Sequence, residues 1–101
     1  HGSFLKAMKF ILKKMKKKKN RKATFVCSLS YKNKNKKIVS VEGKLNGNIS
    51  YKIIGKKGFG YDPIFIPLNK KNTFGQMSKL KKIKMDHRFI AFQKLKKKIK
   101  I

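Results

Sequence analysis

The sequence predicts a mixed α/β fold in which helices cover an antiparallel sheet. Three observations support this class: residues 4–19 and 78–98 carry apolar side chains at helical spacing, residues 25–53 alternate apolar and polar side chains, and a glycine-rich segment follows. A sheet with one apolar face has to lie on helices or on more sheet. The expected order is an N-terminal helix, a strand meander with a hairpin, a glycine-rich loop and two C-terminal helices.

The N-terminal helix is expected over Phe4–Lys19, with lysines opposite an apolar stripe. The stripe consists of Phe4, Leu5, Met8, Ile11, Leu12 and Met15. Such a helix can lie on a membrane surface or bind an acidic partner, but packing on a sheet is the more ordinary arrangement. Residues 1–3 resemble a cloning scar, so the expected domain covers residues 4–101.

Three strands are expected next. The alternating apolar positions are Phe25, Cys27, Leu29 and Tyr31, then Val39, Val41 and Leu45, then Ile49, Tyr51 and Ile53. A polar stretch at 32–36 predicts the first turn, and Asn46-Gly47 predicts a two-residue hairpin turn because both residues tolerate φ > 0. Residues 64–66 are expected to form a short buried strand after the glycine-rich loop.

Two helices are expected at the end of the chain, after a loop over residues 68–77. Ser78 is a candidate N-cap for a short helix reaching Met85, and Asp86 for a longer helix over His87–Lys98. The apolar stripe of the last helix consists of Ala91, Phe92, Leu95 and Ile99.

The charge of the chain is extreme, with 30 Lys and Arg against 3 Asp and Glu and a formal net charge of +27. This favours a nucleic-acid partner, and a small lysine-rich nucleic-acid-binding module with Phe59 and Tyr61 stacking on bases stays an alternative. Only Arg21 and Arg88 are arginine, however, and nucleic-acid readers usually depend on arginine. Abundant Lys, Ile and Asn are also typical of AT-rich coding sequences.

Cys27 is the only cysteine, which excludes a disulfide framework and favours a buried structural thiol. No apolar run is long enough to span a membrane, and no signal peptide is recognisable. We therefore expect no membrane partner and a cytoplasmic location.

Residues 55–67, GKKGFGYDPIFIP, differ from the rest of the chain in being rich in glycine and aromatic residues. Glycines on each side of Phe59 allow close approach of a ligand and positive φ, and Tyr61 and Asp62 add a hydroxyl and a carboxylate. The segment is either a nucleobase pocket or a glycine-rich turn whose aromatic rings belong to the core.

Several short motifs together resemble the inosine/xanthosine triphosphate pyrophosphatase family. They are GFGYDPIFIP at 58–67, Thr73-Phe74, Met77-Ser78, Lys82 and His87-Arg88, with ATFVCSLSY, Gly43 and Gly47 upstream. The resemblance covers residues 5–98 and corresponds to the C-terminal half of the family's usual length. It implies part of a mixed-sheet domain of a hydrolase that acts on acid anhydrides, converting ITP, dITP or XTP to the monophosphate and pyrophosphate.

The resemblance also implies which residues bind substrate. These are Phe59, Gly60, Tyr61, Asp62, Lys82, His87 and Arg88. A hypoxanthine or xanthine ring has a 6-carbonyl acceptor where adenine has an amino donor, so donors from His87, Arg88 and backbone amides would favour the former. Such a site can discriminate on the order of 10⁴-fold. Asp86 stands where the family usually has Ser, and Lys81 and Ile83 replace a usual glutamate and asparagine.

The family's chemistry uses Mg²⁺ and acidic residues of the N-terminal half, together with a phosphate-binding loop there. Glu42, Asp62 and Asp86 are the only carboxylate side chains of this chain, and none is expected to be catalytic or to bind metal. We therefore expect the chain to be the nucleobase-binding portion of such an enzyme, truncated by cloning or by an incomplete gene, and inactive alone. A homodimer is implied by the resemblance.

Overall fold

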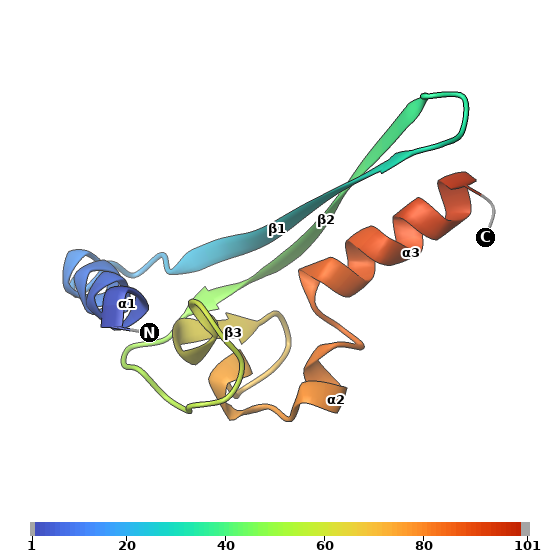
Figure 1. Cartoon of the computed structure of the whole chain (residues 1–101). Helices are drawn as coiled ribbons and strands as arrows, with labels where there is room; N and C mark the ends of the chain where they lie inside the picture. Colours follow the sequence, from blue (N-terminus) through green and yellow to red (C-terminus); the bar gives the residue numbers. More distant parts are fainter. Residues whose placement is uncertain (1, 100–101) are drawn as a thin grey trace.

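The computed structural model describes residues 2–99 and confirms the α/β class (Figure 1). Its elements are α1 (Gly2–Lys14), β1 (Lys22–Lys32), β2 (Ile38–Ile49), β3 (Phe65–Pro67), α2 (Lys79–Lys82) and α3 (His87–Ile99), with 3₁₀ turns at Asp62–Ile64 and Phe74–Gln76. The sheet is antiparallel in the order β1-β2-β3. His1 lies outside the described residues, so the interpretation of residues 1–3 as a cloning scar stays a prediction.

The molecule is elongated, 50 × 27 × 24 Å, because β1 and β2 form a long ribbon. Helix α3 packs along one face of the ribbon, while α1 lies at the end away from the ribbon's turn (Figure 1). In that turn the side-chain oxygen of Asn33 accepts hydrogen bonds from the N–H groups of Asn35 and Lys37, at 2.9 and 3.0 Å. The first predicted turn is thus confirmed, displaced by one residue.

The predicted hairpin at Asn46-Gly47 is wrong, since β2 runs straight through both residues. Gly47 lies between the two neighbouring strands, and a Cβ there would come within 2.4 Å of the Ile66 carbonyl oxygen and 2.6 Å of the Phe65 ring. The glycine therefore serves the close approach of β3, not a turn. The third strand is Phe65–Pro67, and residues 50–61 form the loop that leads to it.

The helix boundaries differ from expectation mainly at α1, which ends at Lys14 instead of Lys19. Arg21 is buried and accounts for this end: its guanidinium donates hydrogen bonds to the carbonyls of Met15, Ile49 and Ser50, at 2.7, 2.8 and 2.6 Å. The chain past α1 is thereby tied to the end of β2. Continuing the helix through four successive lysines would also add unpaired like charges.

Both predicted caps of the C-terminal helices are confirmed. Ser78 Oγ accepts a hydrogen bond from the N–H of Lys81 (3.2 Å), and Asp86 Oδ1 accepts one from the N–H of Phe89 (2.8 Å). The short helix ends earlier than expected, at Lys82.

The core is small and sits where β1, β2 and β3 meet residues 74–77. Phe65, Phe74 and Met77 are buried there, and partly buried Ala23, Phe25, Leu45 and Met85 pack around them. The two helical stripes contribute less than expected: Met8 and Ala91 are buried, but Phe4, Leu5 and Phe92 are exposed. The Cys27 thiol is free and only half-buried.

Candidate nucleobase-binding site

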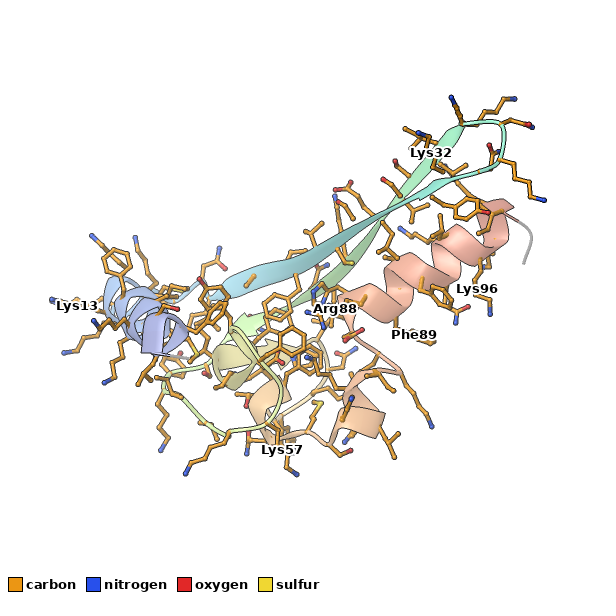
Figure 2. All side chains as sticks on the ribbon, viewed as in Figure 1. Lys13, Lys32, Lys57, Arg88, Phe89 and Lys96 are labelled. Atoms are coloured by element: carbon orange, nitrogen blue, oxygen red, sulfur yellow. The ribbon has the colours of Figure 1, made fainter. Side chains whose placement is uncertain are left out.

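The seven residues predicted to bind substrate come together where the loop before β3, α2 and the start of α3 meet. Figure 2 shows Arg88 at that junction, whereas Lys13, Lys57 and Lys96 lie on separate outer parts of the molecule. Their assignment to a substrate stays a prediction, but their convergence from segments about 25 residues apart in sequence is the arrangement that a binding site requires.

Asp62 and Lys82 form a buried ion pair, with Lys82 Nζ 2.6 Å from Asp62 Oδ2. The same carboxylate oxygen accepts a hydrogen bond from the N–H of Phe59 at 2.9 Å. The glycine-rich loop is therefore held against α2 by a charge-assisted contact, and the backbone at Phe59 is fixed.

The ring of Phe59 lies between the loop and two cations. Lys82 Nζ is 4.2 Å and the Arg88 guanidinium carbon 4.0 Å from the ring centroid, within the range of cation–π attraction. Phe59 as a whole residue is nevertheless 53% exposed, so part of its side chain stays open to a ligand.

The glycines around Phe59 supply the backbone geometry that the sequence suggested. Gly58 and Gly60 have φ of +76° and +64°, which ordinary residues rarely adopt. A Cβ on Gly58 would also come within 2.1 Å of Asp62 Oδ2, whereas one on Gly60 would have only the Phe4 ring nearby, at 3.8 Å.

His87 begins α3 and packs its ring against the ring of Phe25, with centroids 5.0 Å apart. Its Nδ1 is buried and has no hydrogen-bond partner among residues 2–99. Burial lowers the pKa of His87 below its ordinary value of 6.5, Asp86 opposes this shift, and Arg88 adds to it. The imidazole is therefore neutral near pH 7, with one buried polar atom left to pair.

The position of His87 depends on Gly43 in β2. A Cβ on Gly43 would come within 2.2 Å of the His87 carbonyl oxygen and 2.3 Å of the Ala91 nitrogen. Only glycine lets the first turn of α3 lie this close to the ribbon.

A cavity of about 350 Å³ brings these groups together, in the size range of small-molecule sites. It is lined by Phe59, Gly60, Tyr61, Asp62, His87 and Arg88, and also by Phe4, Thr24, Phe25 and Val26. The last four were not predicted. Of these, only Val26 carried a signal in the sequence, as an apolar residue among polar positions of its strand face.

Lys82 lines a second cavity of about 360 Å³, on the α2 side of Phe59. Phe59 and Arg88 border both cavities. Lys82 is thus close to the first cavity through its ion pair with Asp62 but is absent from its lining.

Among the described residues, no group of three or more His, Cys, Asp or Glu side chains could hold a metal ion. Asp62 is bound to Lys82, Asp86 caps α3, and Glu42 lies exposed on β2. These residues do not fit a Mg²⁺ site. Within residues 2–99, no helix is long and apolar enough to cross a membrane.

The sequence matches the Ham1 family over residues 1–98. It is 37% identical over 100 residues to a dITP/XTP pyrophosphatase of Clostridium tetani, covering 99% of this chain and 50% of that protein. It is 48% identical over 90 residues to a dITP/XTP pyrophosphatase of Dictyoglomus thermophilum, covering 85% of this chain and 43% of that protein.

Among solved structures, the Ham1 protein of Staphylococcus aureus superposes with a TM-score of 0.85 at 31% identity, over 92% of this chain and 48% of that one. A Mycobacterium abscessus nucleoside-triphosphatase, or dITP/XTP pyrophosphatase, gives a TM-score of 0.77 at 30% identity, over 94% of this chain and 50% of that one. The chain thus spans about half the length of these relatives.

Proposed function

This chain belongs to the Ham1 family, and from that premise we propose that it forms the nucleobase-binding part of a nucleoside triphosphate pyrophosphatase. The substrates would be ITP, dITP or XTP, cleaved to the monophosphate and pyrophosphate. The observation that carries the proposal is the cavity in which Phe59, His87 and Arg88 face a common space. The names of the relatives support the same substrate class.

The chemistry of these three side chains suits a 6-oxopurine. The Arg88 guanidinium has five donors and no acceptor, so it pairs with a carbonyl oxygen and opposes an amino group. Neutral His87 lines the same cavity with its imidazole ring. Phe59 adds base stacking, typically about 1–3 kcal/mol.

An Arg88→Gln substitution tests this reading against simple charge attraction. The ligand is inosine, because an uncharged nucleoside is not drawn to the lysine-rich surface as a triphosphate would be. Lys84→Gln is the matched control, since it removes the same charge from an exposed side chain that lines neither cavity. We expect Arg88→Gln to weaken inosine binding at least about tenfold, the cost of losing a charged hydrogen bond. Equal effects of the two substitutions would contradict the proposal.

The remaining features of the enzyme are proposals for the protein as a whole. Mg²⁺ and a homodimeric state are implied by the family resemblance, and a cytoplasmic location is the expectation from the sequence. Because residues 2–99 contain no metal-binding cluster, we place no catalytic step on them. The expected result for residues 1–101 with Mg²⁺ and ITP is therefore no pyrophosphate release, measured by a coupled phosphate assay. The net charge of +27 speaks for the alternative of a nucleic-acid-binding module, but the names of the relatives do not.

A further inference from the structure

Val26 is an apolar exception on the solvent-facing side of β1. The other residues of that side include Thr24, Ser28 and Ser30, all polar and exposed. Val26 lies opposite Lys44 of β2 and is 49% exposed. Single exposed apolar side chains are common on folded proteins, and Val is frequent in strands, so the position of Val26 and not its exposure carries the argument.

The position of Val26 matches the cavity that holds Phe59 and Arg88, because it lines that cavity directly. Its two neighbours on β1 are engaged elsewhere. The Thr24 hydroxyl donates a hydrogen bond to Asn46 Oδ1 at 2.8 Å, and the Phe25 ring stacks on Phe65 with centroids 3.9 Å apart. Val26 is the exposed apolar side chain that β1 contributes to this cavity.

We propose that Val26 is a contact residue of the purine ring and a determinant of which bases the site accepts. Its branched methyl groups give the cavity an apolar wall on β1, in addition to the aromatic surface of Phe59 on the loop. A purine needs such apolar cover because its ring faces are poorly solvated by water, while its edge keeps the polar contacts. This inference rests on the proposed function.

Two substitutions test the size and the polarity of this wall. Val26→Trp fills the cavity with a bulky ring, and Ser28→Trp is its matched control, two residues further on the same exposed strand face and outside the cavity lining. Because the chain has no Trp, each variant also reports its own environment by fluorescence. Val26→Thr keeps the shape and replaces one methyl group by a hydroxyl.

Inosine binding is measured by NMR titration of the wild-type chain and the three variants, with amide spectra as the check of folding. We expect Val26→Trp to weaken inosine binding more than about tenfold. Val26→Thr should weaken it about fourfold, the effect of one lost methyl contact. Ser28→Trp should weaken it less than about twofold.

The inference is overturned if Val26→Thr, or a folded Val26→Trp variant, binds inosine as the wild type does. If the wild type binds inosine and Arg88→Gln weakens this binding, the proposed function survives that result. If the wild-type chain does not bind inosine at all, the proposed function and the inference both fail.

Discussion

Lys82 and Asp62 form a buried ion pair of 2.6 Å that joins α2 to the glycine-rich loop. Both side chains are almost inaccessible to solvent, and the shared oxygen of Asp62 also holds the N–H of Phe59. The pair thus sets the position of the Phe59 ring, and with it one wall of the cavity. Its role follows from burial, because a charge in this place needs its partner.

Replacing Lys82 by Met should destabilise the fold strongly, because it leaves the Asp62 carboxylate buried without its cation. The expected loss is about 3–5 kcal/mol in the free energy of unfolding. Lys81→Met, on the same helix but exposed, should change it by less than about 0.5 kcal/mol. Urea denaturation measures both, and similar losses for the two variants would exclude a special role of the pair.

The two glycines flanking Phe59 should differ in their tolerance of a methyl group. Gly60→Ala makes only an ordinary contact with the Phe4 ring and carries the cost of its positive φ, about 1 kcal/mol. Gly58→Ala has the same backbone cost and also collides with Asp62 Oδ2. We expect a clearly larger loss of stability and of inosine binding for Gly58→Ala, measured by thermal unfolding and NMR titration. Equal losses would mean that Asp62 is free to move.

His87 should make the stability depend on pH below its ordinary pKa of 6.5. Burial lowers the pKa in the folded chain, opposed by Asp86 and Asp62 and assisted by Arg88 and Lys82. Between the lowered pKa and 6.5 the unfolded chain binds more protons, so the free energy of unfolding decreases as the pH falls through this window. Below the lowered pKa this loss is complete.

A His87→Asn variant lacks this titration and is the direct check. The difference in unfolding free energy between wild type and variant should change between pH 7 and pH 5, in favour of the variant at the lower pH. His1→Asn provides the control for the other histidine. If the difference in unfolding free energy between wild type and variant stays constant over this range, His87 has the same pKa in the folded and unfolded chains.

Arg21→Lys should destabilise the chain although it keeps the charge. The three hydrogen bonds to Met15, Ile49 and Ser50 come from three different guanidinium nitrogens, and the single ammonium nitrogen of a lysine lacks this planar fork. The expected cost is about 2 kcal/mol or more. Lys22→Arg, at the exposed next position, should be neutral in the same denaturation experiment.

The comparison of sequence and structure separates local from long-range information. The alternation of β1, the N-caps Ser78 and Asp86, and the glycine geometry around Phe59 could be predicted because each depends on a few neighbouring residues. The conformation of Asn46-Gly47 could not be predicted, because it depends on a contact with β3, twenty residues further on.

The same reason limits prediction of the site. The motif residues 59–62, 87 and 88 were predictable as a set, and the structure places them around one cavity. Contacts between elements decide the features that were missed. Lys82 is buried, Arg21 links the end of α1 to the end of β2, and Val26 lines the cavity. In so lysine-rich a chain, composition alone could not single out Lys82 as the lysine that is buried among residues 2–99.

The most direct test of the central claim is the ratio of the dissociation constants of inosine and adenosine for this chain, measured by NMR titration at pH 7. The two nucleosides are uncharged and differ at one edge of the purine: inosine has a 6-carbonyl and an N1–H, and adenosine has a 6-amino group and an unprotonated N1. A donor-rich wall of Arg88 and backbone amides predicts that inosine binds at least about tenfold more tightly. Equal affinities, or tighter binding of adenosine, would contradict it.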